Sequence, residues 1–525
     1  MKKENNMMGM KNSYKIFTHV LMLIFLASCG DDFLEVPVVD TITEDNFYMT
    51  DDQLLAGANT LYGQAFFTAN DKFMYSLDML AGNSIGFEAD APYKLFAVGV
   101  NNRTLLEGWE GFYKGIADAN QLLKIIDQGL SPDISEEVKN QVEGEARFVR
   151  AFAYFYLVRL WGEIPVIDQI TADTSTRYRL NTVPSIYAFI ESDLKKAADL
   201  LPLNPSDQRR VGKTAPWAFL AEMHLTLKDY ENARAYAKMV IDSGLHSLQS
   251  NYQDQFINPS LSVNREGIYR WVWTSINGLW GIQNTNQAYL IDDDDLVGNN
   301  GAFGSVAPSV DLFLAFDKVA DPGEEDLRRK WIIMEPGRQY DELKTVDGGY
   351  TFPENGDNSA TKIRYRKYVV GSLNEHPNVF FMRTEMSTQL MRYADILLIY
   401  AEAILGNGAS TGDAQAIDAF NQVRRRAGLS EKMMISKEDL MNERRIELAL
   451  EAGKFWLDLL RLDRTMARDI IRVQNRGTAN SLVPLDTDPV FVTDIDNANF
   501  LFPIPAAELS FIDTTSPAVD YVIND

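Results

Sequence analysis

Few side chains in this sequence could act as nucleophiles, proton carriers or soft metal ligands. One cysteine, Cys29, and four histidines occur in 525 residues. No H-E-x-x-H sequence and no cysteine cluster offers a metal site, and the P-loop pattern is absent. The histidines are scattered along the chain, at His19, His224, His246 and His376. This inventory predicts a protein that is not an enzyme.

The lone Cys29 could be a nucleophile, a metal ligand, a buried space-filler or an attachment point. It follows a lysine-containing start and the apolar run VLMLIFLA (20–27), which is far shorter than the ~20 residues that span a bilayer. A basic start, a short apolar core and small residues at a cleavage point are typical of a secretory signal peptide. We therefore predict that residues 1–28 are removed.

The sequence Leu26-Ala27-Ser28-Cys29 resembles the bacterial lipobox, whose cysteine is acylated after cleavage. Palmitate-type acyl chains anchor a protein because each buried CH₂ contributes ~0.8 kcal/mol. The acidic sequence GDDFLE (30–35) then resembles the surface-export signal of Bacteroidetes lipoproteins. We expect residues 29–45 to be a lipid anchor and tether, with the protein on the exterior of the outer membrane. The alternative is an ordinary signal peptide that happens to end in cysteine.

Aromatic residues among amides are the strongest sign of a binding site. The densest stretch is YRWVWTSINGLWGIQNTNQAYLIDDDD (269–295). The apolar C–H faces of sugar rings stack on aromatic rings, while amides and carboxylates bind the hydroxyls. The candidate ligand-binding residues here are Trp273, Trp280, Asn284 and Tyr289. Glycines flank Trp280, so we expect it at an exposed loop tip, whereas Trp273 could equally fill the core.

Other polar or charged stretches give weaker signals. The segment LDMLAGNSIGFEADAPY (77–93) adds Asp78, Asn83 and Phe87 as candidate ligand contacts. The run 292–295 makes Asp292 and Asp294 weak candidates for binding Ca²⁺, although it lacks the spacing of a calcium loop. The run 424–426, three arginines near the predicted end of a helix, reads as structural. The net charge of −24 argues against nucleic acid as a partner.

Helical periodicity predicts the elements that must position these residues. Patterns of apolar residues three and four apart cover 51–68, 105–126, 136–162, 215–241, 393–429 and 440–461. Within 215–241, Trp217, Leu220, Ala221 and His224 follow the spacing of the tetratricopeptide repeat. The interval 265–385 is instead rich in glycine, polar and aromatic residues, with expected strands at 267–273 and 363–370. We predict a mainly α fold, built from tetratricopeptide-like helix pairs and a loop-rich, aromatic-rich segment with short strands.

Several of these segments together resemble the SusD/RagB family of outer-membrane nutrient-binding lipoproteins. They are EARFVRAFAYFYLVRLWGEIPV (145–166), MRYADILLIYAEA (391–403), FNQVRRRAGL (420–429), ERRIELALEAGKFWLDLLR (443–461) and FPIP (502–505). The resemblance implies one SusD-like body over 46–525. Its helical scaffold would be 46–245 and 388–465, its binding segment 265–385, and its irregular tail 475–525.

The family resemblance also implies a function. Such a protein captures an oligosaccharide and delivers it to a TonB-dependent, SusC-like transporter, without catalysis and without a required cofactor. Some relatives capture peptides, which is one alternative. A tetratricopeptide scaffold that binds another protein is the other, and it predicts a helix-lined groove rather than an aromatic platform on loops.

Replacing Cys29 with alanine tests the predicted anchor. We expect the Cys29→Ala protein to leave the membrane fraction, because the acylated thiol would be its only link to lipid. Oligosaccharide binding in solution should be unchanged. Cell fractionation and a binding assay on the released protein measure the two effects. Loss of binding together with release would contradict a role limited to anchoring.

Overall fold

Long helices with strong N-caps organise the chain. The structure is a computed structural model that describes residues 47–86, 91–169, 177–275, 280–297, 303–357, 361–372, 376, 379 and 382–523. Asn102, Ser135 and Thr182 each accept a hydrogen bond from the first turn of the helix that follows. Residues Thr50–Asp525 form one compact unit, to which the following description applies.

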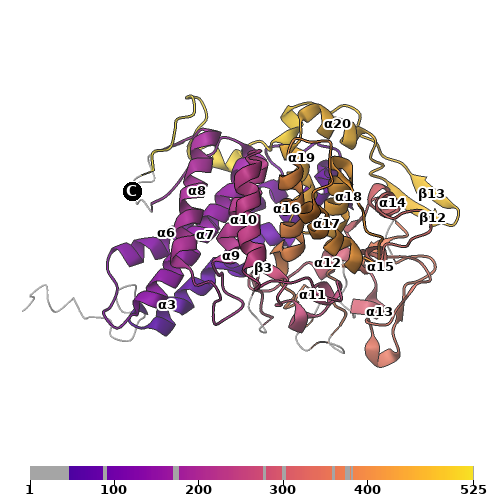
Figure 1. The fold of residues 1–525 in the computed structure, drawn as a ribbon, viewed down its shortest axis with the longest axis horizontal. Coiled ribbons are helices and arrows are strands. Elements are labelled where there is room, and N and C mark those ends of the chain that lie inside the picture. The colour runs from indigo at the N-terminus through magenta and orange to yellow at the C-terminus, as the bar shows by residue number, and fades with distance from the viewer. Residues whose placement is uncertain are drawn as a thin grey trace, which may run out of the picture. The chain divides into compact units, whose positions relative to one another are not determined.

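The helices of the first half pack side by side as antiparallel neighbours (Figure 1). α6 packs on α7, α7 on α8, α8 on α9, and α9 on α10. The α-helices of the first half are α3 Asp51–Ala58, α4 Met74–Leu80, α5 Ala91–Lys94, α6 Arg103–Asp127, α7 Glu136–Trp161, α8 Val183–Leu200, α9 Thr214–Thr226 and α10 Tyr230–Asp242.

The array continues with helices from the second half of the chain. α10 packs directly on α16, α16 on α17 and α18, and α18 on α19. The intervening residues 243–392 therefore form an insertion that leaves the array after α10 and returns at α16. Its helices are α11 Asp254–Ile257, α12 Gln287–Leu290, α13 Asp294–Val297, α14 Val310–Val319 and α15 Arg328–Ile332; those after it are α16 Tyr393–Leu405, α17 Ala414–Arg426, α18 Lys437–Glu447, α19 Lys454–Arg461 and α20 Arg464–Arg472.

The strands are short and pair only in twos among the residues that the structure describes. The longest pair, β3 (Gly267–Trp271) with β9 (Thr388–Arg392), is antiparallel and closes the base of the insertion. The others are β1 Ser84–Gly86 with β4 Val306–Pro308, β5 Ile333–Met334 with β8 Arg364–Tyr365, β6 Gln339–Tyr340 with β7 Tyr350–Thr351, β10 Ser410–Thr411 with β11 Ile435–Ser436, β12 Thr478–Leu482 with β13 Leu485–Asp488, and β2 Tyr178–Arg179 with β14 Ile512–Asp513.

These elements confirm the predicted mainly α class and most of the predicted helices. The periodicity over 215–241 and 393–429 belongs to helix pairs, as expected. Two predicted helices are wrong in extent. The stretch 51–68 stays α-helical only to Ala58, and 440–461 breaks between α18 and α19. The second break occurs because Leu450, Ala452 and Gly453 have positive φ angles.

An aromatic cluster joins the first helices to the insertion. Trp271 of β3 stacks on Phe66 with ring centroids 4.9 Å apart and an interplanar angle of 13°. Phe152 of α7 contacts both rings edge to face, at 6.1 Å from Trp271 and 5.5 Å from Phe66. All three side chains are fully buried. The expected strand at 267–273 is therefore formed over Gly267–Trp271, where every residue is buried.

A second connection between scaffold and insertion is a buried network of ion pairs around Arg392. Its guanidinium contacts Glu266, Glu447 and Glu451, with 2.6 Å from Nε to a Glu451 oxygen. Arg426 shares Glu266 and Glu447 with it. The other members are Arg328, Lys367, Arg424, Asp326 and Glu443, so five cations face five carboxylates.

The network explains the three arginines at 424–426. Arg424 and Arg426 are buried within it, whereas Arg425 lies at the surface and pairs with Glu431. Burial alone would raise the pKa of Glu447, but Arg426, Arg392 and Arg328 offset this and hold it at about 2. The structural reading of this run is therefore supported by its contacts.

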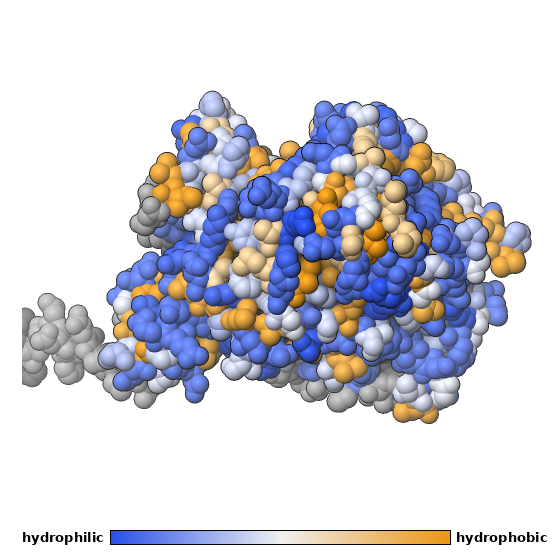
Figure 2. All heavy atoms as spheres, viewed as in Figure 1, coloured by the Kyte–Doolittle hydropathy of each residue, from blue (hydrophilic) through white to orange (hydrophobic). Residues whose placement is uncertain are grey.

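The surface is polar, in line with the acidic composition. On the face shown in Figure 2, hydrophilic residues prevail and the apolar patches are small and scattered. No helix among the placed residues is long and apolar enough to cross a bilayer.

We expect the Arg392→Met substitution to lower the free energy of unfolding by about 3–5 kcal/mol. It removes one cation and leaves Glu266, Glu447 and Glu451 buried with too little positive charge. Urea denaturation at neutral pH measures the loss.

The matched control is Arg425→Met, which removes an exposed arginine from the same arginine run. Its effect should stay within about 0.5 kcal/mol, because exposed ion pairs contribute little. Equal destabilisation by the two substitutions would contradict a special role for the network.

Candidate functional site

α6 brings a short irregular segment into close contact with the helical array. Gly108, Gly111 and Gly115 lie on one face of α6, and a Cβ at any of them would lie within 3 Å of Phe73, Ala69 or Phe66. Because side chains are absent on this face, the segment 63–73 can pack closely against the helix. The segment ends in η4 (Ala69–Phe73), a π-helical turn of a kind often found at functional sites.

Asp71 of this turn holds the insertion in place. Its carboxylate accepts hydrogen bonds from the Thr285 hydroxyl at 2.6 Å and the Tyr289 hydroxyl at 3.0 Å. The neighbouring Lys72 places its Nζ 5.3 Å from the centroid of the Tyr289 ring. A charged turn and an aromatic residue far away in the sequence therefore form one local structure.

Thr388 of β9 makes a second connection beneath the first. Its hydroxyl donates to Asn70 at 2.7 Å and accepts from the Trp273 indole N–H at 3.0 Å. Asn284 also donates to it, at 3.3 Å, and binds the Met386 carbonyl oxygen at 2.6 Å. Trp273 and Asn284 are buried, so their polar atoms serve these internal bonds.

Two aromatic pairs adjoin this buried layer, Phe67 with Trp280 and Tyr289 with Phe303, and we call the two pairs together the aromatic face. Trp280 is 58% exposed and packs edge to face on Phe67, with ring centroids 5.4 Å apart. Phe303 is 53% exposed and stacks on Tyr289 at 5.6 Å. Exposed aromatic rings of this kind are suited to stacking on a ligand.

A turn fixes the position of Trp280. The Gln283 side-chain oxygen accepts hydrogen bonds from the backbone N–H groups of Gly281 and Ile282, at 3.0 and 3.1 Å. Gly281 has a φ of +96°, a left-handed conformation that favours glycine. The expected exposure of Trp280 is thus confirmed, while the preceding residues 276–279 lie outside the described part of the chain.

A polar side pocket of about 540 Å³ opens beside the aromatic face. Trp273 forms part of the pocket wall, and its ring centroid lies 6.3 Å from that of Phe67. Hydrogen-bonding groups line the rest, from Gln64, Asp207, Arg209, Thr274 and Glu385. The site thus combines apolar platforms with polar groups close by.

The structure places the other predicted ligand contacts differently. Asp78 and Asn83 are fully buried: the Asn83 amide donates to Asp78 at 3.2 Å, and Arg445 donates to Asn83 at 2.8 Å. Burial raises the pKa of Asp78 to about 6. Tyr289 is 4% exposed and uses its hydroxyl on Asp71. Tyr289 thus supports the ring of Phe303, whereas Asp78 and Asn83 serve internal hydrogen bonds. Phe87 and Cys29 lie outside the described residues.

The acidic run at 292–295 forms ordinary internal contacts. Asp293 accepts a hydrogen bond from the Tyr350 hydroxyl, and Asp295 pairs with Lys344 at 2.9 Å. Among the residues that the structure places, no three His, Cys, Asp or Glu side chains are grouped to hold a metal ion. Calcium binding by Asp292 and Asp294 stays a prediction without geometric support.

Sequence reasoning missed three features. The first is Phe67 with Asp71, whose signal in the sequence is an aromatic residue four positions before an acidic one. The second is Phe303, an aromatic residue that follows a glycine-containing run. The sequence Gly82-Asn83-Ser84-Ile85-Gly86 also matches the G-x-S-x-G pattern of hydrolases. Ser84, however, is fully buried on β1 and its hydroxyl is 2.6 Å from that of Tyr365, so it is not presented as a nucleophile.

Known sequences and structures match this arrangement. The SusD family pattern matches residues 278–514, and a pattern described as starch-binding associating with outer membrane matches residues 39–225. A SusD-like protein of Bacteroides ovatus is 28% identical over 496 residues, which cover 90% of this chain and 87% of that one. SusD-like protein P2 of Formosa agariphila is 27% identical over 537 residues, covering 94% and 97% of the two chains.

A crystal structure described as a complex with xylogluco-oligosaccharide has the same fold. Its TM-score is 0.81 at 26% sequence identity, and the match covers 90% of this chain and 100% of that one. The two family patterns, the full-length relatives and the fold agree, and the chain belongs to the SusD family.

Proposed function

We propose that this protein binds an oligosaccharide at the aromatic face and delivers it to a SusC-like TonB-dependent transporter. The observation that carries the proposal is the exposure of two aromatic rings, Trp280 and Phe303, together with a polar pocket whose wall includes Trp273, the neighbour of Phe67. Sugar rings can stack on the two aromatic side chains while their hydroxyls reach polar groups such as Gln64. The relative crystallised with xylogluco-oligosaccharide supports a glycan as the ligand.

The location follows from the sequence. The proposal places the protein on the outside of the outer membrane, held by acyl chains on Cys29. The family pattern that names association with the outer membrane supports this address. The described residues of the site offer aromatic rings, amides and the Asp71 carboxylate, which is already hydrogen-bonded, but no activated nucleophile. This composition suits a protein that binds its ligand without reacting with it.

The two alternatives differ in what they require of the surface. A tetratricopeptide scaffold would use a helix-lined groove, whereas the exposed aromatic rings lie on loops and on the segment before η4. A peptide-capturing relative would use the same face. Purifying the native complex with its transporter and identifying the bound cargo by mass spectrometry separates a glycan from a peptide.

Replacing Trp280 or Phe303 with alanine tests the site. We expect each substitution to weaken binding of the best ligand from a glycan array by about 30-fold, since truncating a central aromatic anchor costs about 2 kcal/mol. Isothermal titration calorimetry measures the change.

Phe511→Ala is the matched control, because Phe511 is 54% exposed and lies on the C-terminal tail, away from the aromatic face. It should leave glycan affinity unchanged. If neither Trp280→Ala nor Phe303→Ala weakened binding, the ligand would lie elsewhere and the proposed site would be wrong.

A further inference from the structure

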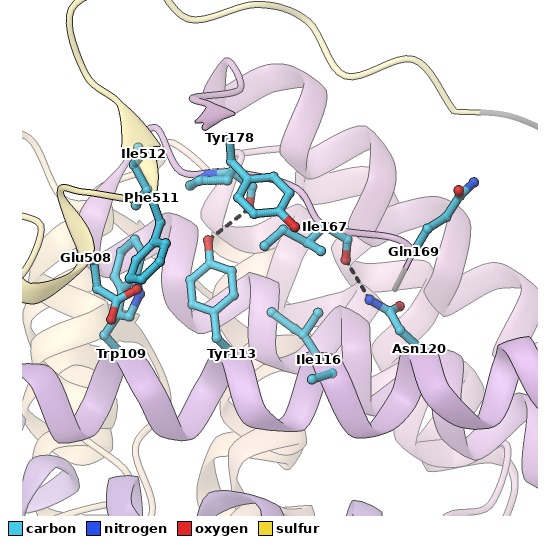
Figure 3. Close-up of a pocket in the computed structure, with 12 residues that line it drawn as sticks. Trp109, Tyr113, Ile116, Asn120, Ile167, Gln169, Tyr178, Glu508, Phe511 and Ile512 are labelled. Atoms are coloured by element: carbon cyan, nitrogen blue, oxygen red, sulfur yellow. Dashed lines mark hydrogen bonds between the residues drawn. The ribbon is translucent and has the colours of Figure 1, made fainter. Parts of the chain in front are cut away.

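A second pocket lies between α6 and the C-terminal tail (Figure 3). Trp109, Tyr113 and Ile116 follow one another on one face of α6, and Glu508 and Phe511 of the tail lie opposite. We call this cavity of about 350 Å³ the Glu508 pocket. It is at the small end of the range for ligand sites, about 300–1,000 Å³.

The walls of the pocket are held by the backbone. The Tyr178 N–H donates to the Phe511 carbonyl oxygen at 2.8 Å, next to the parallel pairing of β2 with β14. The Phe511 N–H donates to the Glu508 carbonyl oxygen at 2.9 Å. Figure 3 shows the rings of Tyr113, Tyr178 and Phe511 gathered around the opening. The aromatic groups are thus in position before any ligand arrives.

Glu508 is the one acidic group among the described residues of this lining. It is half-buried, and among the placed residues it forms no ion pair. Burial raises the pKa of its carboxyl group, and the negative charge of Glu110 raises it further, whereas a hydrogen bond with Trp109 acts in the opposite direction. A carboxylate so placed is stabilised by any cation that enters the pocket.

Two of the other polar side chains that line the pocket, Tyr113 and Asn120, are already engaged. The Tyr113 hydroxyl donates to the Pro165 carbonyl oxygen at 2.9 Å. Asn120 donates to the Ile167 carbonyl oxygen and accepts from Arg150, both at 2.8 Å. Gln169 and Tyr178 add one amide and one hydroxyl to the lining, which are few polar groups for a sugar with many hydroxyls. An anion would be repelled by Glu508 and Glu110.

We propose that the Glu508 pocket binds an alkylammonium group, with Glu508 as its counter-ion and Tyr113, Tyr178 and Phe511 as aromatic walls. Aromatic rings attract an ammonium group through their faces, and the apolar lining receives its carbon chain. The group can belong to a free amine or to a lysine side chain of another protein. The proposal is independent of oligosaccharide binding.

Ligand-observed NMR with choline and 3,3-dimethylbutan-1-ol tests the requirement for charge, because the two molecules share a shape and differ by one positive charge. We expect choline to bind about tenfold more tightly. Nα-acetyl-lysine methylamide, titrated alongside, tests the lysine source. Binding of either cation in preference to the neutral alcohol supports the proposal. Equal binding of choline and the alcohol, with no binding of the lysine derivative, would overturn it.

Two substitutions locate the bound cation. Glu508→Gln should abolish the preference for charge, and Phe511→Ala should weaken choline binding several-fold, while Phe303→Ala should have no effect. Glycan binding should follow the reverse pattern, which also shows that each variant is folded. Charge preference that survives Glu508→Gln would place the cation elsewhere and refute the assignment.

Discussion

The buried ion network around Arg392 is the constraint on which the rest of this structure depends. A charge taken out of water is tolerated only when it is paired and hydrogen-bonded, so ten ionised groups in one interior cluster permit little freedom in how their elements meet. Arg392 ends β9, its partner Glu266 precedes β3, and Glu447 and Glu451 follow from α18. The network therefore fixes the point at which a long insertion leaves and re-enters the helical array. Thr388 lies at the other end of β9, and its hydrogen bonds to Trp273 and Asn70 connect the strand to the residues beside the aromatic face.

Two sides of α6 contact different parts of the chain. Its glycine face lets η4 approach, which places Asp71 where it can hold Thr285 and Tyr289. A second side of the helix, with Trp109, Tyr113 and Ile116, forms the floor of the Glu508 pocket. A substitution on the glycine side should affect the aromatic face, because that side contacts the segment before α4. A substitution on the other side should affect the Glu508 pocket, because that side contacts the C-terminal tail.

The sequence predicted the scaffold well because its signals are local. Periodic apolar residues, cap residues and a C-terminal glycine determine a helix within a few turns, and α7 ends at Trp161 before Gly162 as expected.

The aromatic site was predicted only in part. Trp280 next to glycine signalled exposure correctly, but the same polar and aromatic composition surrounds Asp78, Asn83 and Asn284, which are buried. Their partners, such as Arg445 and Thr388, are distant in the sequence, so no local pattern separates a buried hydrogen bond from a ligand contact. Phe67 and Phe303 escaped for the same reason, since each becomes part of a surface only through its contact with a residue of another segment.

Rigidity beneath exposed rings also bears on affinity. Trp280 is held by a turn in which Gln283 satisfies two backbone N–H groups, and Tyr289, on which Phe303 stacks, is held by Asp71. Immobilising a flexible side chain on binding costs roughly 0.5–1.5 kcal/mol, and a ring that is already held avoids much of that loss. Asn284 and Tyr289, which look like ligand contacts in the sequence, instead use their polar atoms for internal hydrogen bonds to Thr388 and Asp71. In the proposed binding mode, internal bonds of this kind hold the exposed rings in place before a ligand arrives. A shallow, solvent-exposed face needs such order because it gains little from enclosure.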